Sequence, residues 1–186
     1  MSRPKTSLKA EDWLDEALKV LAKEGANAVA VEPLAKRLGV TKGSFYWHFK
    51  NRDMLITELL KFWEVIEQDY IEDYFQRFPD PIERLKAILT ILVDDDINKY
   101  VFLALANGVN DPVFGGAYQK AVSRRLQLFE EIYLSMGIVK SHATHQALKI
   151  YCQYFGLIKL SVDQPSESYT DEIHEFLKND LIQSAL

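Results

Sequence analysis

The sequence contains a single cysteine, Cys152, and only 8 glycines and 6 prolines among 186 residues. One cysteine excludes an intrachain disulfide framework and a thiolate metal cluster, as is typical of proteins in a reducing compartment. No run reaches the length of about 20 apolar residues that spans a bilayer. The first residues are polar and lead into no apolar core of signal-peptide type. These absences predict a soluble, cytoplasmic protein with no membrane partner.

The motifs of common enzymes are also missing. The sequence has no nucleophile elbow, no glycine-rich phosphate loop and no paired-cysteine motif. Asp94, Asp95 and Asp96 point in different directions around a helix, so we interpret them as a solvated helix end and not as an acid–base pair. His142 and His145 lie three apart without a placed carboxylate or thiolate, which favours surface residues over a metal site. We therefore expect no enzymatic activity, no metal and no cofactor.

Patterns typical of strands are lacking too, whereas apolar residues recur every three or four positions along most of the chain. The sequence therefore predicts an all-α protein without internal repeats. Beyond the first 51 residues, the spacing and the breaks at proline, glycine and Asn-Asp-Pro predict helices over 52–78, 82–93, 113–136, 141–162 and 169–181, and a buried apolar segment over 100–109.

Charge is distributed unevenly along the chain. The net charge is −5, but residues 1–50 contain nine Lys or Arg and six Asp or Glu, so the remainder carries −8. A basic N-terminal part favours docking onto a negatively charged polymer through that part alone. Arg3 and Lys5 either form an arm that follows a groove or belong to a frayed terminus.

The most informative pattern lies in residues 32–50, where two short helices meet at a sharp turn. A proline in the first turn and apolar residues along one edge predict a helix over 33–38, with Lys36 and Arg37 on its opposite side. Gly39 can take a left-handed conformation at no steric cost, so it ends this helix. The second helix then begins with Thr41 as its N-cap. This arrangement is a helix-turn-helix.

The second helix presents an unusual outer face. Phe45 and Phe49 lie four apart and are expected to face inward, while no acidic residue occurs from 41 to 50. Small hydroxyls, a glycine, cations and aromatics with polar tips can approach a polyanion closely and donate to it. We expect phosphate contacts from Lys42, Tyr46 and Lys50, positions near base edges for Thr41, Ser44, Trp47 and His48, close backbone approach at Gly43, and further DNA contacts from Arg3, Lys36 and Arg37.

The run VTKGSFYWHFK over residues 40–50, followed by NRDML, resembles the tetracycline-repressor (TetR) family of bacterial transcription regulators. Residues 13–18 and Gly25-Ala26 resemble the first helix of that family, so the likeness covers about residues 8 to 56. One departure is Glu32-Pro33, where many relatives carry a Ser or Thr that donates to a phosphate. The resemblance implies an N-terminal three-helix, helix-turn-helix DNA-binding domain over 1–51, joined by a long helix to a C-terminal helical ligand-binding and dimerisation domain over 52–186.

The resemblance also implies an inducer site and a dimer interface in the C-terminal part. Aromatic residues, 22 in the chain, are the candidate lining of the inducer site, although core packing is the alternative for each. The candidates are Phe62, Trp63, Ile66, Tyr70, Phe102, Phe114, Tyr118, Phe129, Tyr151 and Tyr154. The last two long helices are expected to form a four-helix bundle with their copies, or to face the protomer's own core. The candidate seam residues are Leu148, Tyr151, Cys152, Phe155, Ile158, Ile173, Phe176, Leu177 and Leu181.

Together with these patterns, the resemblance implies a homodimeric transcriptional repressor that a small hydrophobic or aromatic inducer releases from a palindromic operator in double-stranded DNA. Three alternatives stay open from the sequence. The protein could be an activator of the same family, a helical small-molecule-binding protein whose N-terminal head binds another protein, or a protein whose C-terminal pocket carries out chemistry.

Overall fold

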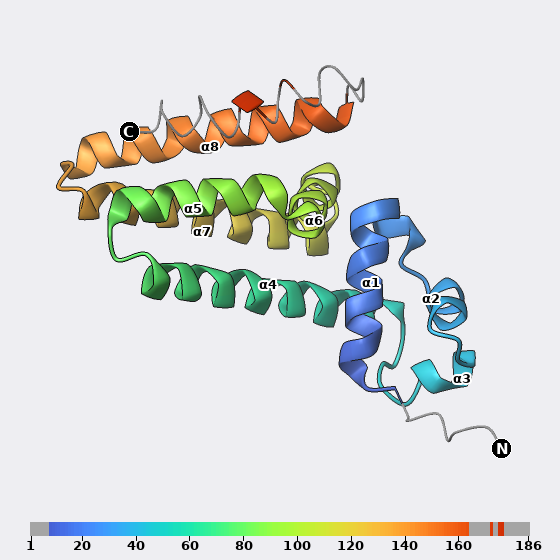
Figure 1. The fold of residues 1–186 in the computed structure, drawn as a ribbon. Helices are drawn as coiled ribbons and strands as arrows, with labels where there is room; N and C mark the ends of the chain where they lie inside the picture. Colours follow the sequence, from blue (N-terminus) through green and yellow to red (C-terminus); the bar gives the residue numbers. More distant parts are fainter. Residues whose placement is uncertain (1–7, 164–171, 173–174, 177–186) are drawn as a thin grey trace. The chain divides into compact units, whose positions relative to one another are not determined.

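The computed structural model describes residues 8–163, 172 and 175–176, and the regular structure within these ranges is entirely helical (Figure 1). The elements are α1 (Ala10–Glu24), η1 (Ala26–Ala28), α2 (Val31–Arg37), α3 (Lys42–Phe45), α4 (Arg52–Arg77), α5 (Pro81–Asp94), α6 (Asp96–Asn107), α7 (Pro112–Ser135) and α8 (Lys140–Asp163). The all-α prediction is confirmed. Most of the helix predicted over 169–181, and the predicted arm at Arg3, lie outside the described residues. None of the described helices combines the length and hydrophobicity that crossing a bilayer requires.

The chain divides into two compact units, Met1–Ile66 and Glu67–Leu186, called unit 1 and unit 2 below. The boundary falls within α4, so each unit includes one part of this helix. The predicted domain boundary between residues 51 and 52 stays a prediction.

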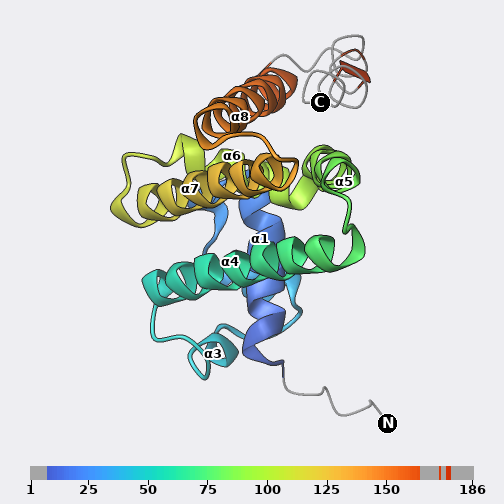
Figure 2. The same cartoon turned by 90° about the vertical axis from the view of Figure 1, so that its left-hand side faces the viewer.

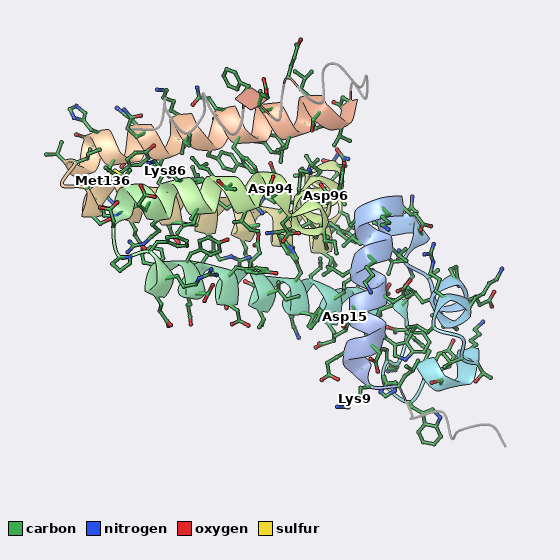
Figure 3. The ribbon with its side chains drawn as sticks, in the orientation of Figure 1. Lys9, Asp15, Lys86, Asp94, Asp96 and Met136 are labelled. Atoms are coloured by element: carbon green, nitrogen blue, oxygen red, sulfur yellow. The ribbon has the colours of Figure 1, made fainter. Side chains whose placement is uncertain are left out.

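Unit 1 is built around an aromatic and aliphatic core. Trp13 of α1 is fully buried, and its ring meets the Phe45 ring of α3 edge-on, with 5.4 Å between centroids. Lys9 and Asp15, labelled in Figure 3, lie at the start and in the first half of α1. The backbone N–H of Lys9 donates to the carboxylate of Asp12 over 2.6 Å, which satisfies one donor at the helix start. The core thus joins the first helix to the helix-turn-helix that follows it.

In unit 2, α8 lies along α7, and α5 and α6 pack on the same helix (Figures 1 and 2). Local capping explains where these helices begin. Asp80 accepts hydrogen bonds from two N–H groups of α5, and Asp111 does the same for α7. A proline follows each of these aspartates at the start of the helix, where its missing N–H has no intrahelical partner. Gly137, with φ of 84°, lies in the turn after α7, directly beyond the helix predicted over 113–136.

The predicted helix end at Asp94 to Asp96 is confirmed (Figure 3). Asp94 is the last residue of α5, and Asp95 caps α6 by accepting from the Asn98 N–H over 3.0 Å. The prediction of a buried segment over 100–109 is wrong at its end. Because α6 stops at Asn107, Val109 lies in the following turn and is 45% exposed.

Two adjacent glycines of α7 offer a matched test of packing. A Cβ at Gly115 would lie 2.3 Å from the carbonyl oxygen of Val109, whereas a Cβ at Gly116 would meet nothing within 4 Å. We expect Gly115→Ala to lower the free energy of unfolding by about 1–3 kcal/mol through overpacking. Gly116→Ala should raise it by up to about 1 kcal/mol, because alanine restricts the unfolded chain. Urea denaturation of both variants measures this, and equal midpoints would contradict the close approach of Val109 to α7.

Candidate nucleic-acid interface

The turn between α2 and α3 has the geometry that the sequence predicted. Gly39 has φ of 66°, in the left-handed region. Its N–H donates to the Lys36 carbonyl over 3.2 Å, and the Val40 N–H donates to the Ala35 carbonyl over 3.0 Å. These two bonds make a Schellman motif, which ends α2 and redirects the chain within two residues. Thr41 is the N-cap residue of α3, also as predicted.

Packing, and not intrinsic helix propensity, holds α3 in place. Four residues are too few to form a stable helix alone. Phe45 is fully buried between the Trp13 and Phe49 rings, with centroids 5.4 Å away in both cases, and Phe49 is 3% exposed. The prediction that both phenylalanines face inward is confirmed. The segment that follows α3 is held as well, because the N–H groups of His48 and Phe49 donate to the Phe45 carbonyl.

The other side of this segment faces solvent. Trp47 is 87% exposed and Tyr46 55% exposed, although large aromatic side chains are ordinarily buried in part. A methyl group at Gly43 would meet only the Thr41 hydroxyl at 3.7 Å, so the fold does not require glycine there. Thr41, Lys42, Gly43 and Lys50 are also exposed, while Ser44 and His48 are half-buried. The structure thus brings the predicted donors of residues 41–50 onto one accessible segment.

The cations of unit 1 are in two different situations. Arg37 is paired with Glu24 and lies 3.7 Å from Glu16, both on α1. In contrast, Lys36 and Lys50 have no carboxylate partner in the described part of the chain. The expected DNA contact of Arg37 would therefore compete with two acidic side chains, whereas Lys36 and Lys50 are free to meet a phosphate.

Lys42 has a carboxylate partner that sequence reasoning missed. Its Nζ lies 2.7 Å from Oε1 of Glu32, in the first turn of α2, and both side chains are exposed. The hydrogen bond from Lys42, and then its charge, hold the pKa of Glu32 below its ordinary value, and the same contacts raise the pKa of Lys42. Both groups are therefore ionised at neutral pH. The sequence showed Glu32 as an unusual residue, but the angle between α2 and α3 decides its pairing.

The contacts of Arg52 were also not predicted from the sequence. Its Nε donates to the Val29 carbonyl and its Nη2 to the Ala26 carbonyl, each over 2.7 Å. Asn51 precedes it, and its side chain accepts from the Met54 N–H over 2.9 Å at the start of α4. Both contacts belong to unit 1. They tie the first turn of α4 to the loop that leads into α2.

Unit 2 contains a cavity of about 40 Å³. Its lining residues come from α4, α5, α6 and α7 and are Glu67, Tyr70, Ile71, Tyr74, Ile88, Ile91, Leu92, Asn98, Arg124, Arg125 and Leu128. Of the ten residues predicted for an inducer site, one, Tyr70, lines this cavity. Phe62, Trp63 and Ile66 belong to unit 1. Phe102, Tyr118, Tyr151 and Phe155 form a cluster of rings with neighbouring centroids 5.4–6.4 Å apart, and Phe114, Phe129 and Tyr154 are buried core residues.

A buried ionic cluster lines this cavity, and sequence reasoning did not identify it. Glu67 of α4 accepts from Arg125 over 2.7 Å and from Arg124 over 3.1 Å, both on α7. A signal for it exists in the sequence. Arg125 falls in register with Ala121, Leu128 and other buried residues of α7, so the helical pattern alone places a guanidinium on the buried face.

The predicted seam residues of α8 separate into two groups. Leu148 is 51% exposed and Cys152 is exposed, so both are accessible to a partner. Tyr151 and Ile158 are buried within the protomer, and Phe155 is half-buried. Phe176 is 41% exposed. Ile173, Leu177 and Leu181 lie outside the described residues.

The histidines predicted as surface residues, His142 and His145, are exposed. In the described ranges, no group of three or more His, Cys, Asp or Glu side chains is arranged to hold a metal ion.

Comparison with known proteins links these features to a family. The model of "Bacterial regulatory proteins, tetR family" matches residues 14–59, which contain the helix-turn-helix. The HTH-type transcriptional regulator AcrR of Shigella flexneri is 33% identical over 90 residues, which are 46% of this chain and 40% of AcrR. The regulator SrpR of Pseudomonas putida is 24% identical over 187 residues, 98% of this chain and 67% of SrpR. The chain thus spans less than half the length of AcrR and about two thirds of that of SrpR.

The fold has counterparts among solved structures. A transcriptional regulator from Saccharomonospora viridis, solved in complex with choline, superposes with a TM-score of 0.78 and 19% sequence identity, over 94% of this chain and 95% of that one. Solved structures thus share the fold of this chain, an N-terminal helix-turn-helix followed by a helical C-terminal part. The match over residues 14–59 assigns the helix-turn-helix region of this chain to the TetR family of bacterial regulatory proteins, and the related regulators support a TetR-family transcriptional regulator.

Proposed function

We propose that the protein is a homodimeric, ligand-responsive repressor that binds a palindromic operator in the cytoplasm and needs no cofactor. The observation that carries this proposal is the exposed segment of residues 41–50. It is rich in hydrogen-bond donors, contains no acidic residue and is held in place by the buried side chains of Phe45 and Phe49. Such a segment fits the major groove of DNA, where phosphates position a protein and base edges specify the sequence. Repetition by two-fold symmetry would place two of these segments on half-sites about 34–36 Å apart.

The proposed contacts follow from exposure and charge. Tyr46 and Lys50 are assigned to phosphates, and Lys42 joins them when a phosphate replaces Glu32 as its partner. Thr41, Ser44, Trp47 and His48 are assigned to base edges or the adjoining sugars. The absence of a side chain at Gly43 lets the backbone come close to the duplex.

Release by a ligand is proposed to act through α4. This helix contributes Glu67, Tyr70 and Tyr74 to the cavity of unit 2, and its first residue, Arg52, is bonded to the loop before α2 in unit 1. A ligand that binds one position of α4 better than another would shift the population between them. The change would reach the helix-turn-helix along one continuous helix and lower operator affinity by the difference in ligand affinity for the two states.

The proposal is tested by selecting bound sequences from a random pool of DNA duplexes with the purified protein, together with gel filtration. Recovery of a palindrome by a dimer is the expected result. If no sequence is enriched even at low salt, where phosphate contacts are strongest, the DNA-binding role is wrong.

Removing the carboxylate next to the DNA-facing segment should strengthen DNA binding. In Glu32→Gln, Lys42 loses its charged partner, and a negative charge near the phosphates is removed. We therefore expect operator affinity to rise about fivefold for each copy of unit 1 in the dimer. The measurement is a fluorescence anisotropy titration at several salt concentrations. Glu58→Gln, which breaks the exposed pair with Lys61 on α4, is the matched control and should leave affinity unchanged. Equal or weaker binding by Glu32→Gln would show that Glu32 does not face the DNA.

An acidic residue on the exposed face of α8 should dissociate the dimer. Leu148 is 51% exposed in the protomer, so Leu148→Glu should leave the folding of the protomer unchanged. In a two-fold seam the change would set like charges against each other, and we expect the dimer to weaken at least about a hundredfold. Sedimentation velocity over a concentration series measures this. Val113→Glu, at a residue 47% exposed on α7, is the control. An unchanged dimer would rule out this face as the seam.

A further inference from the structure

The cavity of unit 2 has apolar walls and one ionic end. The walls come from aliphatic residues of three helices, Ile71 of α4, Ile88, Ile91 and Leu92 of α5, and Leu128 of α7. Tyr70 and Tyr74 of α4 also line it. The ionic end is formed by Glu67 with Arg124 and Arg125. A site of this kind suits a ligand with an apolar body and one polar group that fixes its orientation.

The carboxylate of Glu67 is already paired with two cationic side chains. Its side chain is 7% exposed, its Oε1 accepts from Arg125 and its Oε2 accepts from Arg124. An ammonium ligand would have to displace a guanidinium from this buried carboxylate, which would leave a buried positive charge with a weaker partner. The cavity therefore disfavours a cationic ligand, although it contains a carboxylate.

Arg125 has donor capacity that the fold does not use. The residue is 3% exposed, and its guanidinium lies over the Phe102 ring at 3.6 Å from the centroid. One of its amino groups, Nη2, donates to Glu67, but the buried Nη1 has no hydrogen-bond partner. Buried N–H groups of charged side chains are nearly always bonded, so an unmet donor on a residue that lines a cavity points to a missing acceptor.

We propose that this cavity binds an apolar molecule that carries a single carboxylate, and that the carboxylate accepts a hydrogen bond from Nη1 of Arg125. Apart from the tyrosine phenols, the ionisable groups of the lining are two guanidiniums and one carboxylate, so a negative ligand charge is favoured. A carboxylate also makes a stronger hydrogen bond to a guanidinium than a neutral oxygen does. The inference rests on the proposed function, in which unit 2 holds the inducer.

Binding would have to enlarge the cavity. About 40 Å³ is well below the ~150 Å³ of an engineered apolar cavity that holds benzene. Tyr70 is 43% exposed and Tyr74 is half-buried, so both rings can turn toward solvent at little cost in burial. Both belong to α4, and a ligand that displaces them acts on the helix to which the proposed release mechanism assigns the signal.

The test compares matched ligands that differ only in the charge of one end. Butanoate, hexanoate, octanoate and phenylpropanoate are titrated into the full chain by calorimetry at neutral pH, beside the alcohol and the ammonium compound of each. At least one carboxylate should bind about tenfold more tightly than its alcohol, because the alcohol lacks the charge-assisted hydrogen bond. Its ammonium counterpart should not bind measurably. Tighter binding of the alcohols or ammonium compounds, or no binding by any compound, would overturn the inference.

A variant then assigns the preference to Arg125. Arg125→Met leaves Glu67 paired with Arg124 and should bind the carboxylate and the alcohol equally. Arg77→Met removes an exposed arginine of α4 that does not line the cavity, and should keep the tenfold preference. If Arg125→Met does not fold, as judged by circular dichroism, the titrations of the unchanged protein still decide. Because these titrations contain no DNA, failure to select an operator would overturn the proposed function while leaving the ligand result intact.

Discussion

Replacing Glu67 with leucine is expected to lower the free energy of unfolding by about 3–5 kcal/mol, the largest effect of any single change that we predict. The carboxylate is 7% exposed and bonds guanidinium groups of both Arg124 and Arg125. Arg125 is itself 3% exposed and cannot reach water when its partner is removed. A buried charge that loses its counter-ion costs far more than the intact pair contributes, because desolvation is no longer offset.

The size of this effect distinguishes a buried cluster from a surface ion pair. Glu72→Leu, at an exposed position on the same helix, is the control and should change stability by less than about 0.5 kcal/mol. The double variant Glu67→Leu with Arg125→Met removes both members of the closer pair and should recover much of the loss. Chemical denaturation followed by circular dichroism gives all three values. A cost for Glu67→Leu no greater than that for Glu72→Leu would mean that the cluster is hydrated.

The parts of the fold that the sequence predicted are those set by local chemistry. The left-handed turn at Gly39, the N-cap at Thr41 and the turn at Gly137 after α7 depend on a few consecutive residues. The limits of α4, predicted as 52–78, agree with the structure within one residue, because prolines follow its end. Such signals act within one turn of helix and can be read without knowing what packs against it.

The contacts that the sequence did not predict join residues far apart in the chain. Glu67 and Arg125 are separated by 58 positions, and Arg52 and Val29 by 23. Helical periodicity marks which face of a helix is buried, but it does not say which helix covers that face. Even the pairing of Glu32 with Lys42, only ten positions apart, depends on the angle at Gly39.

The aromatic residues illustrate the same limit. Their number suggested a ligand site, yet the cavity is lined mainly by aliphatic and ionic side chains, with Tyr70 and Tyr74 as its aromatic members. Phe102 lies instead beneath the Arg125 guanidinium, and Tyr154 donates from its hydroxyl to the Leu92 carbonyl over 3.3 Å. An aromatic ring packs equally well against a core or a ligand, so composition alone does not separate the two.

Replacing Trp47 with alanine should abolish most operator binding and leave stability unchanged. At 87% exposure the indole contributes almost nothing to the core of unit 1, so the free energy of unfolding should change by less than about 0.5 kcal/mol. In the proposed complex the same indole lies against base edges, where one good interaction is worth about 1–3 kcal/mol. In a dimer the substitution removes the indole from both heads, so we expect affinity to fall at least about a hundredfold.

The salt dependence shows which kind of interaction each substitution removes. Trp47 carries no charge, so Trp47→Ala should reduce affinity with no change in the slope of affinity against salt concentration. Lys50→Ala, in contrast, should reduce that slope by about one unit for each phosphate that the lysine no longer neutralises, and weaken binding to all sequences alike. Val65→Ala, at a residue 52% exposed on α4, controls for the removal of an exposed apolar side chain and should change neither quantity. If Trp47→Ala binds the operator as the unchanged protein does, the exposed segment of residues 41–50 is not the surface that reads DNA.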